Sequence, residues 1–206
     1  MTALLKPEAR KVVLASASAI RRTLLTNAGI PVTIDPGAVD EDEVKQAMKK
    51  EGAPATAVAE TLAELKAMRV AARHGDAFVF GADSMLECNG IWFDKPADRD
   101  HAAAHLTALS GRTHRLISSA VCVRNRARIW HHTSIALLTM RPLTRAFIDS
   151  YLDAAGTTVQ RSVGAYQLEG LGAQLFSKIE GDYFTVLGLP LLPILAFLRD
   201  NQVLVE

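Results

Sequence analysis

Short apolar runs alternate with helical patterns along the first half of the chain. Val12–Ala15, Val32–Ile34 and Phe78–Phe80 are apolar, β-rich runs typical of buried strands. The segments Ile20–Leu25 and Ala55–Arg73, the latter rich in alanine, have apolar residues at helical spacing. We interpret these strands as parts of an α/β sheet.

The second half begins with a hairpin signal and continues with longer strands. Asn89-Gly90 predicts a tight turn that folds Ile91–Phe93 back beside Met85–Cys88. Two further runs, His114–Val123 and Ala127–Met140, alternate enough to form an antiparallel pair. Helical patterns complete this half, over Asp98–Leu109, Thr144–Ala155 and the end of the chain after Leu187.

Candidate chemistry follows the strand Phe78–Phe80. Gly81 and Ala82 have little or no side chain, so a ligand or metal could approach the backbone there. We expect Asp83 at or just past the end of this strand, where α/β sheets bind ligands. The hairpin would bring Lys95 toward Asp83, which suits phosphate and a divalent metal. The alternative is a solvated aspartate followed by an ordinary hairpin.

A second candidate lies where the first strand meets the first helix. Ser16 or Ser18 would cap that helix, and free N–H groups at a helix N-terminus attract phosphate. Arg21 and Arg22 place positive charge in the first turn, against the helix dipole, and a bound anion would give them a purpose. The alternative is a serine cap followed by solvated arginines.

Two further charged positions have open interpretations. The acidic cluster Asp40–Glu43 opens a helix, either as favourable first-turn acids or with one carboxylate that reaches a metal. Lys66 lies beside the apolar face of its helix, either as a snorkelling surface lysine or pointing into a cleft.

His101 and His105 have zinc-compatible spacing, but an exposed polar helix face is the stronger interpretation because no third ligand is evident.

Composition limits the classes of protein to consider. The 206 residues are 49% hydrophobic and show no internal repeat or linker, which predicts a single domain over residues 1–206. The formal net charge of +1 argues against a broad nucleic-acid-binding face. Cys88 and Cys122 form no C-x-x-C motif, which fits a reducing cytoplasm. We expect no secretory signal and no membrane span, and phosphate-loop and nucleophile-elbow motifs are absent.

With these residues in hand, the sequence resembles the Maf family of nucleoside triphosphate pyrophosphatases, also described as septum-formation inhibitor proteins. The resemblance runs nearly end to end and depends on the order of several short motifs. They are Leu14–Ser18 with Arg21-Arg22, Val39–Glu41, Leu62-Ala63 with Lys66-Ala67, Gly81–Ser84, Lys95-Pro96, Leu109–His114, Gly164–Tyr166 and Gly188–Pro190.

The resemblance implies a mixed, curved β-sheet flanked by helices, with two lobes around a deep cleft, as in Maf and inosine-triphosphatase-like proteins. It implies hydrolysis of a nucleoside triphosphate to the monophosphate and pyrophosphate with a divalent cation, Mg²⁺ or Mn²⁺, and a homodimer. Glu41 and Asp83 would hold the metal, and the catalytic residues would be Asp83, Lys95 and Glu41. The substrate-binding residues would be Ser16, Arg21, Arg22, Lys66 and Glu169.

Departures from the family pattern bear on the base. Ala19 replaces a usual proline, Ile20 stands where dTTP- and UTP-cleaving members often have arginine, and Glu169 stands where they often have glutamine. These positions resemble the branch that acts on 7-methyl-GTP, so we expect a purine preference if Glu169 faces the base; otherwise it braces the glycine-rich turn. A rival interpretation is a nucleotide-binding regulator of cell division without catalysis, which has no need of Asp83 as a base.

Overall fold

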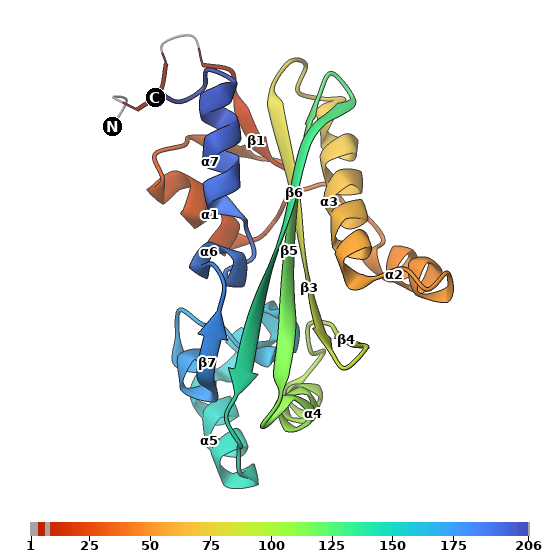
Figure 1. The fold of residues 1–206 in the computed structure, drawn as a ribbon, viewed down its shortest axis with the longest axis vertical. Coiled ribbons are helices and arrows are strands. Elements are labelled where there is room, and N and C mark those ends of the chain that lie inside the picture. Colours follow the sequence, from red (N-terminus) through yellow and green to blue (C-terminus); the bar gives the residue numbers. More distant parts are fainter. Residues whose placement is uncertain (1–3, 7–8, 206) are drawn as a thin grey trace. The chain divides into compact units, whose positions relative to one another are not determined.

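The structure is a computed structural model that describes residues 4–6 and 9–205 (Figure 1). Its strands are β1 (Val12–Leu14), β2 (Val32–Ile34), β3 (Phe78–Cys88), β4 (Ile91–Phe93), β5 (Thr113–Arg124), β6 (Ala127–Met140) and β7 (Phe176–Glu180). Its α-helices are α1 (Ala19–Asn27), α2 (Glu41–Lys50), α3 (Ala55–Ala71), α4 (Arg99–Leu109), α5 (Arg145–Ala155), α6 (Tyr183–Val186) and α7 (Leu191–Asp200). Three 3₁₀ helices, η1 (Gly156–Arg161), η2 (Val163–Ala165) and η3 (Leu171–Leu175), lie between α5 and β7.

The strands form one mixed sheet in the order β2-β1-β3-β5-β6-β7, and β4 pairs with β3. β1 runs parallel to both β2 and β3, whereas the β3–β4 and β6–β7 pairs are antiparallel. The expected α/β fold with a mixed sheet flanked by helices is therefore confirmed. The predicted cleft stays a prediction.

The chain separates into two compact units that share three strands. Unit 1 comprises the described residues up to Asp83 together with Ser118–Ser134 and 188–205, and unit 2 comprises Ser84–Ile117 and Ile135–Leu187. β3, β5 and β6 each contribute residues to both units. The prediction of a single domain stays a prediction.

The core of unit 1 follows from the two-residue period of β3. Phe78 and Phe80 point to one face, where both rings pack edge-on against Phe197 of α7. Val79 points to the other face and packs with Ala63 and Ala67 of α3. Within this unit, α1 and α7 therefore cover one side of the strands and α3 covers the other (Figure 1).

The end of β3 differs from the expectation. Asp83 does not lie at or past the end of a strand, because β3 continues through it to Cys88. Gly81 also has another purpose than access for a ligand, since a Cβ there would lie 1.9 Å from the carbonyl oxygen of Ala63. The glycine lets α3 approach the strand backbone closely, a requirement that comes from a helix distant in sequence.

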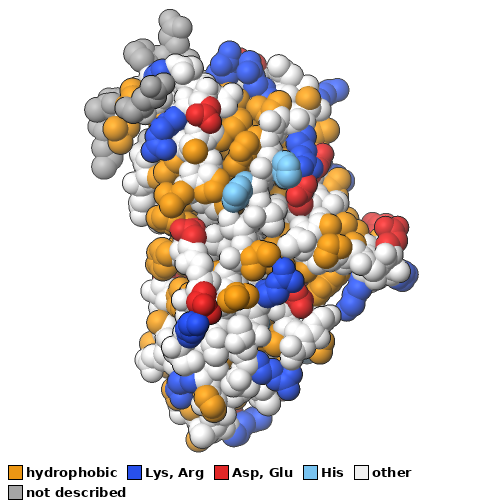
Figure 2. Space-filling view, in the orientation of Figure 1, with side chains coloured by type: hydrophobic (Ala, Val, Ile, Leu, Met, Phe, Trp, Pro, Cys, Tyr) orange, Lys and Arg blue, Asp and Glu red, His pale blue; other side chains and the backbone are white. Residues whose placement is uncertain are grey.

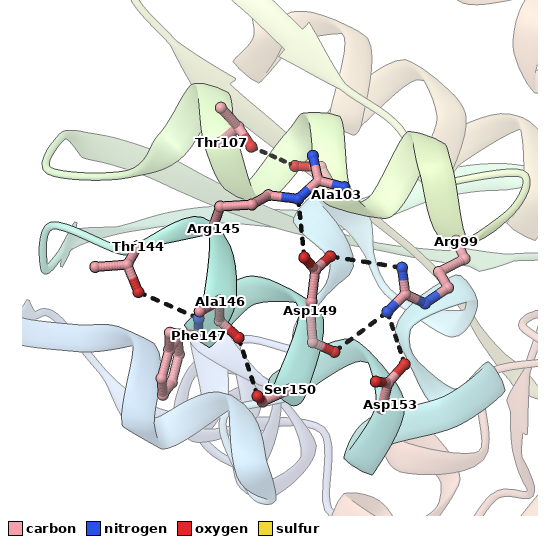
Figure 3. A network of polar contacts seen from close by, with 10 residues as sticks. All are labelled: Arg99, Ala103, Thr107, Thr144, Arg145, Ala146, Phe147, Asp149, Ser150 and Asp153. Carbon is pink, nitrogen blue, oxygen red and sulfur yellow. Dashed lines mark hydrogen bonds and ion pairs between the residues drawn. The ribbon is translucent and has the colours of Figure 1, made fainter.

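Unit 2 contains the predicted hairpin and a helix pair. Leu86 pairs with Phe93 and Cys88 with Ile91 across the Asn89-Gly90 turn, which confirms the hairpin. Figure 3 shows how polar contacts connect α4 to α5: Arg99 of α4 points toward α5. There its guanidinium lies 2.6 Å from a carboxylate oxygen of Asp153 and also contacts Asp149.

The core of unit 2 brings together two of the sequence motifs, Leu109–His114 and Gly164–Tyr166. His114 Nε2 lies 2.8 Å from the hydroxyl of Tyr166, and both side chains are buried. Burial lowers the pKa of His114 to about 4, so this imidazole is neutral at physiological pH. His101 and His105 have separate contacts: His101 contacts the helix-capping Asp98, and His105 packs edge-on against Phe93. The described residues contain no cluster of three potential metal ligands.

The face drawn in Figure 2 has side chains of both charges. Over unit 1, acidic and basic side chains are interspersed in this view. Arg128, for example, forms ion pairs with Glu60 and Glu64 of α3. Among the described helices, none is long and apolar enough to cross a membrane.

Candidate active site

A buried lysine between two carboxylates forms the centre of the candidate site in unit 1. Lys66 Nζ lies 2.6 Å from Asp83 Oδ1 and 2.6 Å from Glu41 Oε1. The side chains of Lys66 and Asp83 are 10% and 7% exposed, whereas the Glu41 side chain is more open at 38%. Close contact with both acids compensates the burial of the ammonium, so the interpretation of Lys66 as a snorkelling surface lysine is wrong.

Side-chain periodicity explains why Lys66 and Asp83 meet. Val79, Gly81 and Asp83 alternate along β3 and therefore share the face that α3 covers. Ala63 and Lys66 are three residues apart in α3 and therefore face the strand together. On the face of β3 that α3 covers, Val79 and Gly81 are followed by the acidic Asp83, and the contact with Lys66 forms there.

Glu41 reaches the pair because the preceding loop packs closely on α3. A Cβ at Gly37 would lie 2.4 Å from the carbonyl oxygen of Lys66, so only glycine allows this approach. Asp40 then caps α2 by accepting a hydrogen bond from the amide of Glu43, which makes Glu41 the first helical residue. The acidic cluster therefore opens α2, as one interpretation expected, and Glu41 contacts Lys66; a carboxylate that reaches a metal stays a prediction.

One oxygen of Asp83 is available for chemistry. Asp83 Oδ2 is buried and accepts no hydrogen bond from any residue that the structure describes. A buried carboxylate oxygen without a partner is costly in a folded protein, and such atoms mark places where a ligand, ion or water binds. This oxygen can accept a proton from water or bind a cation.

The first strand–helix junction places Ser16 and Arg21 together. Ser18 caps α1, and its side chain accepts from the amide of Arg21. Arg21 is buried, and its Nη1 donates to Ser16 Oγ at 3.0 Å and to the carbonyl oxygen of Ala82 at 2.8 Å. Its Nε donates to the carbonyl oxygen of Gly188 at 2.8 Å. Arg22, the next residue, is exposed.

The charge on Arg21 is opposed by burial and favoured by the acids of the site. Burial lowers the pKa of this guanidinium, while Asp83 and then Glu41 raise it by electrostatic attraction. Arginine keeps its charge in proteins, so the four groups Arg21, Lys66, Glu41 and Asp83 have balanced formal charge. The positive charge that Arg21 places in the first turn of α1 is thus compensated by Asp83 of β3 and Glu41 of α2.

Lys95 and Glu169, the remaining candidates, belong to unit 2. Lys95 follows β4 and is exposed, and its approach to Asp83 stays a prediction. Glu169 is also exposed, in the turn between η2 and η3. Backbone contacts of Gln167 with Gly170 and Gly172 close that turn. This favours the interpretation in which the carboxylate of Glu169 does not brace the turn.

Sequence reasoning missed the partners of Arg21. The carbonyl groups of Ala82 and Gly188 accept its hydrogen bonds, and no side-chain pattern identifies an acceptor of the main chain. The Gly188-Leu189-Pro190 motif was the only signal, and it indicated no role.

Comparison with known proteins agrees with the motifs. The sequence model of a family described as "Maf-like protein" matches residues 11–201. A nucleoside triphosphate pyrophosphatase of Paramagnetospirillum magneticum is 58% identical over 94% of this chain and 100% of its own length. A 7-methyl-GTP pyrophosphatase of Rhizobium etli is 50% identical over 92% of this chain and 96% of its own. A nucleoside triphosphate pyrophosphatase of Rhodospirillum rubrum is 45% identical over the whole of both chains.

Proposed function

The chain belongs to the Maf-like protein family, and from this premise we propose that it hydrolyses a nucleoside triphosphate to the monophosphate and pyrophosphate. It is then a hydrolase that acts on an acid anhydride. The observation that supports the reaction most directly is the contact of the buried Lys66–Asp83 pair with the half-open Glu41, which leaves Asp83 Oδ2 without a partner among the described residues.

Asp83 is the residue we assign to water activation. Its Oδ1 is held by Lys66, which fixes the carboxylate plane and leaves Oδ2 to orient water and accept its proton. The water oxygen then bonds to the α-phosphorus, the bond from this phosphorus to the α,β-bridging oxygen breaks, and pyrophosphate leaves. A general base in this position contributes about 10²–10⁴-fold to the rate.

Basic groups must offset the charge of the triphosphate before water can attack. We assign this role to Lys66 inside the site and to exposed Arg22 and Lys95, with Ser16 as a neutral hydrogen-bond donor. Electrostatic neutralisation of this kind supplies most of the catalysis in phosphoryl chemistry, since the protein needs no covalent intermediate.

The residues present also fit a divalent cation. Asp83 Oδ2 lacks a protein partner among the described residues, and Glu41 is half-open beside it. Mg²⁺ typically binds one or two carboxylates together with substrate phosphates, so two acids without a third ligand suit it. We propose that Glu41 and Asp83 hold Mg²⁺ or Mn²⁺, which when bound would neutralise phosphate charge.

For the base, we propose a guanine nucleotide methylated at N7. The carboxylate of Glu169 accepts hydrogen bonds and cannot donate them, which suits the N1–H and 2-amino donors of guanine. The positive charge of 7-methylguanine adds to the attraction. The similarity to a 7-methyl-GTP pyrophosphatase supports this choice, whereas another relative has the broader printed name.

The experiment is a panel of canonical and modified triphosphates with Mg²⁺ or Mn²⁺, followed by separation of the products. We expect a monophosphate and pyrophosphate. Orthophosphate with a nucleoside diphosphate would exclude attack at the α-phosphorus. Binding without turnover across all metals and bases would favour the non-catalytic regulator. The homodimer, the cytoplasmic location and a role in septum formation stay predictions.

A further inference from the structure

The guanidinium of Arg21 connects three segments that are far apart in the sequence. Its acceptors include Ser16 Oγ in the loop after β1, the carbonyl oxygen of Ala82 in β3 and that of Gly188 before α7. Nε has a single N–H and Nη1 has two, so these contacts use three of the five N–H donors, and the other two are on Nη2. Arg21 is 9% exposed, about as buried as Ser16 and Lys66, so it is distinguished from them by its contacts with backbone carbonyl groups and not by its burial.

The contact with Ala82 continues the β-ladder beyond the end of β1. The amide of Ala15 donates to the carbonyl oxygen of Phe80 at 2.7 Å, and the parallel register ends there, with Leu14 opposite Phe80. Carbonyl groups two residues apart in a strand point to the same side, so that of Ala82 faces the same edge. Arg21 supplies the donor that β1 no longer provides, and it thereby holds the peptide group that joins Ala82 to Asp83.

The contact with Ser16 limits what that hydroxyl can do. Ser16 Oγ accepts from Arg21 Nη1 at 3.0 Å and from the amide of Ser18 at 3.3 Å. A serine hydroxyl has two acceptor lone pairs and one O–H donor. With both lone pairs engaged, its remaining capacity is as a donor, which an anionic phosphate oxygen can accept.

We propose that Arg21 is a positioning residue of this enzyme and not a ligand of the triphosphate. It fixes the Ala82–Asp83 peptide, and with it the aim of Asp83, and it turns the hydroxyl of Ser16 toward an anionic oxygen. The kinetic test of this inference rests on the proposed function, because it needs turnover of a triphosphate. It replaces the role in phosphate contact that the family resemblance implied for Arg21.

The kinetic test compares Arg21→Lys with Arg22→Met. A lysine keeps the charge but cannot contact three acceptors at once, so we expect kcat to fall about 10²-fold, as for a misplaced catalytic group. KM should rise no more than it does in Ser16→Ala. Arg22→Met, which removes an exposed cation of the same helical turn, should instead raise KM. Arg69→Met, an exposed arginine of α3, is the control that should change neither constant.

A binding test does not depend on turnover. Inorganic triphosphate is titrated calorimetrically into wild type, Ser16→Ala, Arg21→Lys and the double variant. We expect Ser16→Ala to weaken binding about fivefold, the loss of one hydrogen bond. Any loss from Arg21→Lys should disappear in the Ser16→Ala background, because Arg21 acts on phosphate only through Ser16.

The outcomes separate the two proposals. Absence of triphosphate hydrolysis by wild type would overturn the proposed function, while the binding cycle would still decide the role of Arg21. A loss of binding from Arg21→Lys that persists in the Ser16→Ala background would identify Arg21 as a direct ligand and overturn the inference. Binding that does not depend on Ser16, or a kcat unchanged in Arg21→Lys, would overturn it as well.

Discussion

The amine of Lys66 and the carboxylate of Asp83 lie 2.6 Å apart, and both side chains are almost completely buried. The contact engages one carboxylate oxygen of Asp83 and leaves the other without a partner among the described residues. Lys66 therefore orients the acid while Asp83 compensates the ammonium. Removal of either group should consequently affect activity and stability in different proportions.

Asp83→Asn should abolish most of the turnover and preserve the fold. The amide has the shape of the acid and can still accept a hydrogen bond from Lys66, but it cannot take a proton from water. We expect kcat to fall about 10²–10⁴-fold. Tm should stay close to that of wild type, because Glu41 Oε1, also 2.6 Å from Lys66 Nζ, still compensates the ammonium. Asp76→Asn, at an exposed aspartate just before β3, is the matched control and should leave kcat unchanged. Full activity of Asp83→Asn would show that Asp83 is not the base.

Lys66→Met should destabilise the protein, because it leaves two carboxylates facing each other beside a buried apolar group. Loss of one partner of a buried ion pair costs about 3–5 kcal/mol. The double variant Lys66→Met/Asp83→Asn should recover part of this loss, since it also removes the buried charge. Urea unfolding measures the free energy of unfolding of the single and the double variant. Lys178→Met removes a lysine from an exposed pair with Glu180 and should cost about 0–1 kcal/mol. Additive losses in the double variant would contradict a coupled pair.

Glu169→Gln should change the preferred base. Wild type should cleave 7-methyl-GTP with a higher kcat/KM than dTTP or UTP, and the glutamine should shift this ratio toward the pyrimidines because it can also donate. The measurement is kcat/KM for all three substrates. Glu180→Gln, at another exposed carboxylate of unit 2, should keep the wild-type ranking. If wild type already prefers dTTP and UTP, the assignment of Glu169 to the base is wrong.

His114 should make the fold sensitive to mild acid. Its pKa is lowered from about 6.5 to about 4 by burial, so the unfolded chain binds a proton at higher pH than the folded protein. Stability should therefore decline as the pH falls from about 6.5 to about 4, by at most about 3.5 kcal/mol at about 1.4 kcal/mol for each pH unit. Asp35 acts in another range: Arg73 and His74 lower its pKa to about 2, so its contribution is lost only between about pH 4 and pH 2.

The dependence of Tm on pH tests this prediction. His114→Gln has no imidazole to protonate, so its Tm should vary less than that of wild type between pH 7 and pH 4.5. Tyr166→Phe, which removes the hydroxyl beside Nε2 but keeps the imidazole, should retain the wild-type dependence. Parallel curves for wild type and His114→Gln would contradict the prediction.

The parts of this protein that the sequence predicted well are determined locally. The turn at Asn89-Gly90 encodes its hairpin within a few residues, and both of its residues have the positive φ that a tight connection requires. The serine cap of α1 and the acidic start of α2 were equally legible, because a cap and its amide are three residues apart.

The parts that the sequence did not predict depend on distant segments. Gly81 follows an apolar run and so resembles the end of a strand, but in the structure it allows close contact with the backbone of Ala63 in α3. Arg21 donates to carbonyl groups 61 and 167 positions away, and no side-chain pattern identifies such acceptors. Glu41, Lys66 and Asp83 were each identified as candidates, but their mutual contact follows from the packing of α2 and α3.

The close approach at Gly81 has a consequence for descent within the family. A methyl group at this position would lie 1.9 Å from the Ala63 carbonyl oxygen, so strand and helix would have to separate. Position 81 precedes Asp83 by two residues, and Ala63 precedes Lys66 by three, so the same separation would lengthen the contact between the acid and the amine. A lineage could therefore retain every charged residue of the site and still lose its activity through a single hydrogen-to-methyl change. Identity at the charged positions alone is then an insufficient criterion for inherited function, and the glycine between them has to be read as part of the site.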